Sequence, residues 1–200
     1  MSAAYERLLE TAERLFSERG YVAVTLRDIG TELGITHASL YYHVPGGKEE
    51  LFIEVTQRAL LRHRLGLEKA ISQASSVLQE QLRAAALWFL SQPPVDLSRM
   101  SRSDLPALDQ AEAERLTKVA YESIILPIEQ IFVAASAHEK YRLPSPILVA
   151  VSFIQIVGGI REAQRYTTTT TECMVDEMIE ILLHGIESGS GSKTDDSSFP

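Results

Sequence analysis

The spacing of apolar residues along the chain predicts helices throughout. Within the first twenty residues the apolar side chains recur at helical intervals, at Leu8, Leu9, Ala12, Leu15 and Phe16. Gly20 follows this run and is expected to end the helix. No segment shows the strict alternation of apolar and polar residues that a half-buried strand requires. The pattern predicts an all-α fold of about nine helices.

Two short helices are predicted after the first. Thr25 and Asp28 have the spacing of a capping box, with aspartate in place of the usual glutamate, so a helix is expected to begin there. Gly34 ends it after about two turns. Thr36 can cap the next helix, which is expected over residues 36–43.

The rest of the chain predicts longer helices separated by helix breakers. A fourth helix is expected from Lys48 to Leu65. Further helices are predicted over residues 71–90, 107–138, 147–166 and 172–187, the second of them kinked near Pro127. Residues 95–105 are polar and predict a loop or a short helix, and the polar tail at 189–200 is predicted to be disordered.

Composition narrows the class of protein. Hydrophobic residues make up 45% and charged residues 23% of 200 residues, which is usual for a soluble globular protein able to bury a core. The single cysteine, Cys173, excludes an internal disulfide framework and cysteine-based zinc sites. The N-terminus is charged and amphipathic, unlike a signal peptide, and the apolar run over 147–160 is too short to span a bilayer. We therefore expect a cytoplasmic protein without a membrane partner.

The charge distribution singles out one segment. The formal net charge is -8, yet the stretch LGITHASLYYHVPGGK, residues 33–48, contains no aspartate or glutamate. The first 48 residues hold five basic and six acidic side chains, and the others hold fourteen basic and twenty-one acidic. An acidic chain has little non-specific affinity for nucleic acid. A segment without carboxylates and rich in hydrogen-bond donors therefore indicates a specific binding surface.

Residues 26–43 have the organisation of a helix-turn-helix. Two short helices meet at a glycine turn, and the apolar positions that hold them together are Ile29, Leu33, Ile35 and Leu40. Gly30 lies one turn before Gly34, where the two helices come closest. The second helix of such a unit lies in the major groove of DNA with its N-terminal residues at the base edges. Any one tyrosine or histidine here can instead be a core residue, but the whole arrangement favours DNA binding.

Two stretches, LFSERGYVAVTLRDIG and LGITHASLYYHVPGGKEELF, carry a family resemblance. With them, residues 8–52 resemble the DNA-binding domain of the TetR family of bacterial transcriptional regulators. The chain departs from the family pattern at three places, with Gly30 for alanine, Val44 for phenylalanine and Gly46-Gly47 for a single serine. The resemblance implies three parts: a DNA-binding domain at 2–62, an effector-binding and dimerisation domain at 63–188, and the tail at 189–200.

The resemblance also implies which residues contact DNA. The candidates are Thr25, Arg27, Thr36, His37, Ser39, Tyr41, Tyr42, His43 and Lys48. His37 and Ser39 can donate to base acceptors, and the small Ala38 allows close approach. The two tyrosines and His43 are placed to reach phosphates. Lys48 adds positive charge at the N-terminus of the fourth helix, where backbone N–H groups suit an anion.

Family members typically bind a small molecule between the middle helices, and the ligand shifts the spacing of two DNA-binding domains. The candidate lining residues are His63, Trp88, Phe89, Tyr121, Ile125, Phe153 and Val157. They imply a mostly apolar ligand, with Arg99, Arg102 or Arg161 available to an anionic group. Core packing is the alternative for each of these side chains.

A homodimer is expected because specific affinity usually needs two half-sites and a two-fold symmetric protein. The last two long helices are the expected interface, with candidate residues Ile154, Gly158, Met174, Met178, Ile181 and Leu182. Burial inside one subunit is the alternative for part of this set.

The resulting hypothesis is a dimeric, sequence-specific repressor that a small ligand releases from a palindromic double-stranded DNA operator. A constitutive DNA-binding regulator without ligand control is the main alternative, and a helical enzyme or adaptor is a more distant one.

The sequence contains no nucleophile elbow, phosphate-binding loop or zinc-protease motif, so we expect no catalytic residues and no cofactor. The five histidines are too scattered to predict a metal site. Cys173 lies near a predicted helix start, which can lower the pKa of a thiol and permit a redox role, although a lone cysteine is usually passive.

Overall fold

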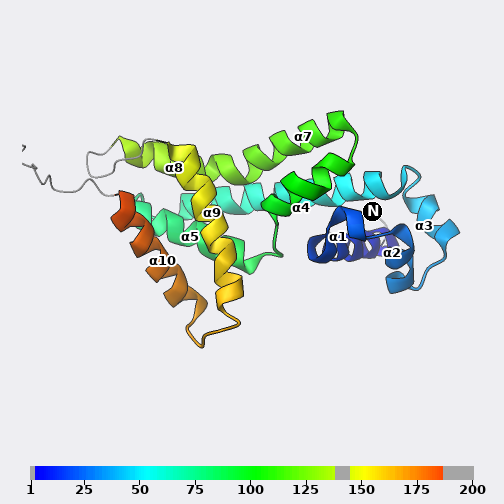
Figure 1. Ribbon diagram of the computed structural model, residues 1–200, viewed down its shortest axis with the longest axis horizontal. Helices are drawn as coiled ribbons and strands as arrows, with labels where there is room; N and C mark the ends of the chain where they lie inside the picture. Colours follow the sequence, from blue (N-terminus) through cyan, green and yellow to red (C-terminus); the bar gives the residue numbers. More distant parts are fainter. Residues whose placement is uncertain (1–2, 138–144, 187–200) are drawn as a thin grey trace, which may run out of the picture.

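A computed structural model of the chain describes residues 3–137 and 145–186, and every regular element in those residues is helical (Figure 1). In chain order the elements are α1 (Ala3–Ala23), α2 (Leu26–Leu33), α3 (His37–His43), α4 (Gly47–Gln73), α5 (Leu78–Ser91), α6 (Leu97–Arg99), η1 (Met100–Asp104), η2 (Leu105–Ala107), α7 (Gln110–Ala120), η3 (Tyr121–Ile125), α8 (Leu126–Ser136), α9 (Pro146–Ala163) and α10 (Thr171–Ile186). If α6 is counted with η1 and η2, and α7 with η3 and α8, these residues contain nine helices. The predicted all-α fold is confirmed, and the tail at 189–200 lies outside the described residues.

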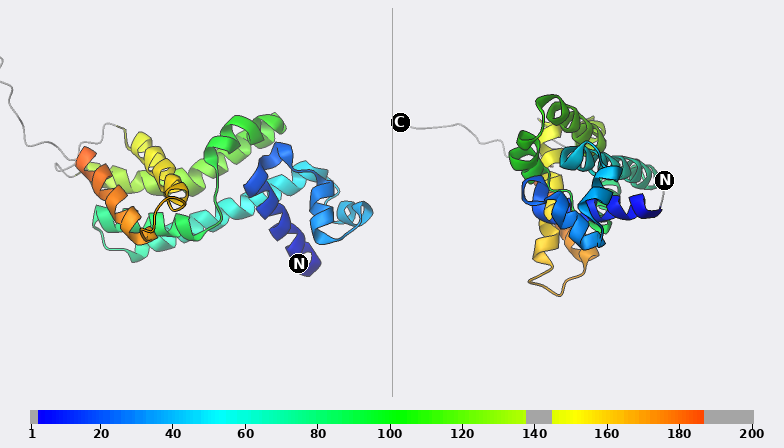
Figure 2. Two further views of the ribbon diagram at one scale, coloured as in Figure 1. Left: turned by 60° about the horizontal axis from the view of Figure 1, so that its bottom comes forward. Right: turned by 90° about the vertical axis from the view of Figure 1, so that its right-hand side faces the viewer.

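The molecule is elongated, with α1, α2 and α3 at one end and α9 and α10 towards the other (Figures 1 and 2). The chain changes direction at Gly20, whose φ of 81° and ψ of 166° fall outside the helical region and suit glycine. The predicted stop at Gly20 is therefore confirmed, and a short final turn follows it. Tyr21 then points inward and packs against Phe52, with ring centroids 4.8 Å apart.

A first hydrophobic core joins the N-terminal helices to the middle of the chain. Leu15, Ile29, Leu40 and Leu51 are at most 1% exposed, so α1, α2, α3 and α4 all contribute to it. The same core includes buried side chains from the segment that follows α5, namely Met100, Leu105, Leu116, Ala120 and Ile124. The N-terminal helices are thus packed against the rest of the chain and share a core with it.

The long helix α4 crosses from this core into the C-terminal half of the molecule (Figure 1). The predicted end at Leu65 is wrong, because α4 continues to Gln73. Gly66 serves close packing instead: a Cβ at this position would lie 1.9 Å from Cζ2 of Trp88 on α5. The predicted helix over 71–90 is also wrong at its start, since α5 begins at Leu78. In the break between the helices the Ser75 hydroxyl accepts the N–H of Val77, a local bond that competes with helix formation.

Replacing Gly66 by alanine is expected to lower the free energy of unfolding by about 1–3 kcal/mol, because the indole of Trp88 must move out of a packed position. This cost outweighs the gain of up to about 1 kcal/mol in helix propensity. Thermal and urea unfolding measure the change. Gly159→Ala is the matched control, since the added Cβ meets nothing within 4 Å on α9. Equal stability of the two variants would mean that α4 and α5 do not approach this closely.

The predicted helix over 107–138 is confirmed as a nearly continuous helical segment that begins at Gln110, where Asp109 caps α7. Its irregularity is a π-helical turn, η3, in which the N–H of Leu126 bonds to the carbonyl of Tyr121. The turn ends at Ile125, two residues before Pro127, which has no N–H to donate. The predicted kink near Pro127 therefore takes the form of a π-turn.

A second core gathers α5, α8, α9 and α10 around the C-terminal part of α4. Its fully buried side chains include Leu67, Leu82, Phe132, Phe153 and Ile179. α9 begins at Pro146 behind the cap Ser145, and α10 begins at Thr171 after the exposed threonines, close to the predicted bounds.

Two helical stretches, Gln110–Ser136 and Pro146–Ala163, are long and apolar enough to cross a membrane by length and composition alone. The same composition is found in core helices of soluble proteins. Within the protein 44% of the apolar window of the first stretch is buried, but only 22% of the second. α9 therefore carries more apolar surface than the described part of one chain covers.

Candidate nucleic-acid interface and internal cavities

The turn between α2 and α3 is built from the residues that the sequence indicated. Thr25 Oγ1 accepts the N–H of Asp28 at 3.2 Å, and Asp28 Oδ2 accepts the N–H of Thr25 at 2.8 Å, so the capping box is confirmed. The Thr25 hydroxyl also donates to Asp28 Oδ2 at 2.6 Å, and this bond, followed by the bond from the Thr25 N–H, lowers the pKa of Asp28. Gly34 has a positive φ of 66°, and Thr36 caps α3 by accepting the N–H of Ser39 at 3.3 Å.

One face of this helix pair is buried and the other is open. Ile29, Leu40 and Val44 are at most 1% exposed and point into the first core. A Cβ on Gly30 would lie 3.4 Å from the carbonyl oxygen of Ile35, so Gly30 lies close against the turn that leads to α3. Because the core takes these apolar groups, the polar side chains of α3 remain on the outer face.

Most of the predicted DNA-contact residues lie on that outer face, at the end of the molecule (Figure 1). The exposed ones are Thr25, Arg27, Thr36, Tyr41 and Tyr42, and the half-buried ones are Ser39, His43 and Lys48. The side chain of His37 lies outside what the structure describes. Tyr42 is 85% exposed, and its ring contacts that of His43 edge-on at 5.4 Å. No residue between 33 and 48 is a carboxylate, so the exposed positions of α3 carry none.

Lys48 occupies a more protected position than its neighbours. Its Nζ donates to the carbonyl oxygen of Tyr21 at 2.9 Å and lies 4.0 Å from the centroid of the Tyr21 ring. Burial there lowers the pKa of the ammonium group. Beside it, Glu50 Oε2 accepts the N–H of Gly46 at 2.6 Å, so one backbone donor at the start of α4 already has a partner. Contact of Lys48 with a phosphate stays a prediction.

The model of the bacterial regulatory proteins of the tetR family matches residues 8–55, the part of the chain that forms this surface. Residues 8–55 form a TetR-family domain. Over 49 residues the chain is 51% identical to the HTH-type transcriptional regulator LmrA of Bacillus subtilis (strain 168), which is 24% of this chain and 26% of LmrA. Over 47 residues it is 45% identical to the biofilm operon icaADBC negative transcriptional regulator IcaR of Staphylococcus epidermidis, covering 24% and 25% of the two chains. The chain thus spans about a quarter of the length of these curated relatives.

The fold that surrounds the TetR-family domain has solved counterparts. The structure of AibR in complex with isovaleryl coenzyme A and operator DNA superimposes with a TM-score of 0.73 at 21% sequence identity. That match covers 90% of this chain and 98% of the other. At this identity the similarity shows the fold alone, and it extends well beyond the TetR-family domain.

A cavity of about 470 Å³ lies between α4, α5, η3 and α9. Three of the predicted ligand residues line it: His63, Phe89 and Val157. Two predicted interface residues, Ile154 and Gly158, line it as well, together with Arg161. Sequence reasoning missed the segment Pro93–Asp96, which we call the strap. Two consecutive prolines after a helix were the signal for a stiff extended segment at this place.

The other four predicted ligand residues lie elsewhere. Trp88 covers Gly66, and its buried Nε1 has no hydrogen-bond partner among the described residues. The Tyr121 hydroxyl donates to Glu129 Oε2 at 2.7 Å. Phe153 packs edge-on against Phe132 in the second core, and Ile125 ends the π-turn. None of the four lines the cavity of about 470 Å³.

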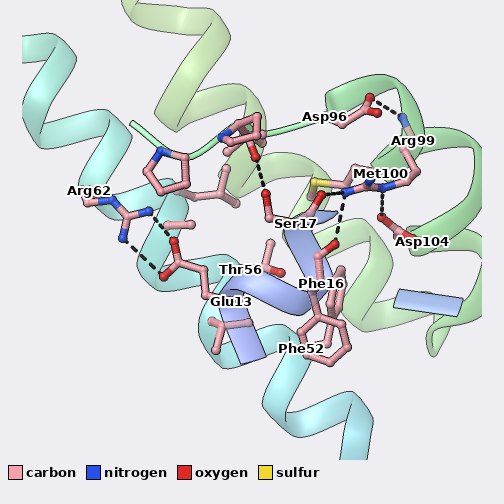
Figure 3. Close-up of a pocket in the computed structure, with 16 residues that line it drawn as sticks. Glu13, Phe16, Ser17, Phe52, Thr56, Arg62, Asp96, Arg99, Met100 and Asp104 are labelled. Atoms are coloured by element: carbon pink, nitrogen blue, oxygen red, sulfur yellow. Dashed lines mark hydrogen bonds and ion pairs between the residues drawn. The ribbon is translucent and has the colours of Figure 1, made fainter. Parts of the chain in front are cut away.

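The strap also forms a wall of a second, smaller cavity of about 70 Å³ between α1, α4 and η1 (Figure 3). A set of polar contacts ties this region to the end of α1. Arg99 Nη2 donates to the carbonyls of Ser17 at 2.7 Å and Phe16 at 3.1 Å, and its Nε faces Asp104 Oδ2 at 3.4 Å. The buried Asp104 accepts the N–H of Tyr21 at 2.8 Å through Oδ1. We call Arg99 and Asp104 the clamp, since together they fix the chain on both sides of Gly20.

The predicted dimer residues divide between surface and core. Gly158 and Ile181 are exposed, whereas Ile154, Met174 and Leu182 are half-buried and Met178 is buried within the chain. Further exposed apolar side chains on α9 are Ile147, Leu148 and Ile156. α9 and α10 therefore present an apolar surface, although Met178 faces the second core.

Cys173 is exposed at the start of α10, and its Sγ lies 3.6 Å from Glu177 Oε1. The hydrogen bond to this carboxylate, and its charge, raise the pKa of the thiol. The expectation of a lowered pKa is wrong, because the acidic neighbours outweigh the helix start. Within residues 3–137 and 145–186 no three histidine, cysteine, aspartate or glutamate residues gather as a metal site.

Proposed function

We propose that the protein is a homodimeric transcriptional repressor that binds a palindromic operator in bacterial cytoplasm and leaves it when a small, mostly apolar ligand binds. The observation that carries the proposal is the outer face of α3, which combines exposed hydrogen-bond donors with the absence of carboxylates on a TetR-family domain. In this proposal Thr36 and Ser39 read base edges together with His37, and Tyr42 and Lys48 contact phosphates. The relative IcaR is named as a negative regulator, which supports repression.

The dimer is supported by the uncovered apolar surface of α9 and α10. Leu148 is 64% exposed and Ile181 is 75% exposed, and exposed apolar patches of this kind mark association surfaces. A two-fold axis through these helices would leave both copies of α3 at the far end, where they can enter successive major grooves. Residues 2–62 then act as the DNA-binding domain and residues 63–188 as the effector and dimerisation domain.

Ligand control is supported by the larger cavity and by its connection to the N-terminal helices. A constitutive regulator without ligand control was expected to have a filled core. The observed cavity of about 470 Å³ instead lies within the usual size of a ligand site. The strap borders this space on one side and the smaller cavity on the other. Shortly after the strap, the clamp holds α1 by Arg99. We propose that ligand binding moves the strap and, through the clamp, changes the orientation of α1, α2 and α3.

The test begins with the selection of duplexes from a random pool by the purified protein, followed by footprinting upstream of its own gene. We expect a selected site with two inverted half-sites and a dimer by sedimentation. Ile181→Glu should give monomers that bind this site at least about tenfold more weakly. Recovery of no preferred duplex at low salt would contradict the proposal, and a single unpaired half-site would contradict the dimer.

A further inference from the structure

The larger cavity has both apolar and charged lining residues. Phe89, Ile124, Ile154 and Val157 supply apolar surface. Arg161 on α9 supplies a guanidinium group next to Phe89. This combination suits a molecule that has a hydrocarbon body and one charged group.

His63 is a buried polar group without a partner. It is 1% exposed, and neither Nδ1 nor Nε2 has a hydrogen-bond partner among the described residues. Its ring packs against Phe89 with centroids 5.6 Å apart. Burial, followed by the charges of Arg62 and Arg161, lowers its pKa to about 4, so the ring is neutral at pH 7. A neutral imidazole offers one donor and one acceptor, and leaving both unused when buried is unfavourable.

Arg161 is a partly buried cation without a carboxylate. Its Nη2 donates to the carbonyls of Phe89 and Gln92, both at 2.6 Å. No aspartate or glutamate of the described residues forms an ion pair with it. Burial lowers its pKa, as expected for a cation that lacks a counter-charge.

The nearby acidic groups are engaged elsewhere. Glu162 pairs with Arg165 at 3.3 Å at the cavity mouth. Asp96 Oδ1 accepts the N–H of Arg99 at 2.8 Å and caps α6. Arg161 and Arg165 are matched in number by Asp96 and Glu162 among the lining residues, so the cation without a carboxylate is Arg161 and not the cavity wall as a whole.

We infer that the cavity binds an amphipathic carboxylic acid, with its hydrocarbon body against Phe89, Ile154 and Val157 and its carboxylate at Arg161. The inference rests on the proposed ligand control and adds the chemical class of the ligand. The carboxylate supplies the missing counter-charge, and a charge-assisted hydrogen bond is stronger than a neutral one. The volume is sufficient for a small acid and its chain.

The test compares acids and alcohols of equal length: butanoate, octanoate and dodecanoate with 1-butanol, 1-octanol and 1-dodecanol. Isothermal titration calorimetry with the full chain should give the best-fitting acid an affinity about tenfold to a hundredfold above its alcohol, as a charge-assisted bond implies. Arg161→Gln should remove this preference. Arg165→Gln, which changes an exposed and already paired arginine at the mouth, should keep it.

Two further variants separate binding from folding. Arg161→Lys keeps the charge and should retain part of the preference even if the glutamine variant is unstable. His63→Leu changes a buried side chain in the cavity wall and should leave the ratio of acid to alcohol affinity unchanged. Equal affinity for acid and alcohol, or no acid bound at any length, would overturn the inference. Operator binding measured on the same samples shows separately whether the regulator function itself holds.

Discussion

Replacing Ala38 by glutamate is expected to lower the affinity for the selected operator by at least about a hundredfold, because like charges brought together at an interface cost several kcal/mol. Ala38 is exposed in the first turn of α3, on the face that lacks carboxylates. The new carboxylate would face the bases and phosphates of the major groove. An acid in a first helical turn is favourable for the helix, so the fold should not suffer. Fluorescence anisotropy at one fixed salt concentration measures the loss, since salt alone changes such affinities.

Two controls separate charge from size and position. Ala38→Gln adds nearly the same volume without charge and should cost much less affinity than the glutamate. Thr169→Glu adds a carboxylate in the exposed segment between α9 and α10, far from α3, and should bind like the unchanged protein. If Ala38→Glu binds the operator with unchanged affinity, α3 does not contact the DNA.

Replacing Asp104 by alanine is expected to lower the free energy of unfolding by about 3 kcal/mol, the cost of removing one partner of a buried pair. Asp104 is 3% exposed, and the change leaves Arg99 Nε and the N–H of Tyr21 without their acceptor. Because the clamp links the strap to α1, operator affinity should also become less sensitive to ligand. Urea unfolding measures the first effect, and operator titrations with and without ligand measure the second.

The matched control is Asp176→Ala. Asp176 pairs with Arg83 at 2.8 Å, but its side chain is 46% exposed, so its loss should cost less than about 1 kcal/mol. Two variants of equal stability would mean that the clamp contributes nothing beyond a surface ion pair. If the operator affinity of Asp104→Ala still responds fully to ligand, then contacts other than the clamp connect the ligand cavity to the N-terminal helices.

The sequence was most informative where structure depends on neighbouring residues. The capping box at Thr25 and Asp28, the left-handed turn at Gly34 and the buried Ile29 and Leu40 follow from spacing alone. The surface of α3 followed from the absence of acids in one segment. These features need only local geometry and one packed face, so a single sequence is enough to predict them.

Features that depend on distant contacts were not predictable in the same way. The fourth helix was expected to end at Leu65, but it continues through Gly66, where a close contact with Trp88 of another helix requires glycine. Lys48 was placed on phosphates, whereas in this structure its ammonium group contacts Tyr21. The cavity walls come from α4, the strap and α9, and no local pattern brings His63 and Arg161 to the same space.

The passage of α4 through both cores limits how this chain can be recombined. The predicted domain boundary at residues 62 and 63 falls within an unbroken helix, between Leu60 of the first core and Leu67 of the second. One inserted residue there would rotate the N-terminal helices by about 100° and shift them by about 1.5 Å relative to the C-terminal half of the molecule. A chimera that exchanges the N-terminal module must therefore preserve the number of residues between Leu60 and Leu67, while the sequence in that interval is freer to vary.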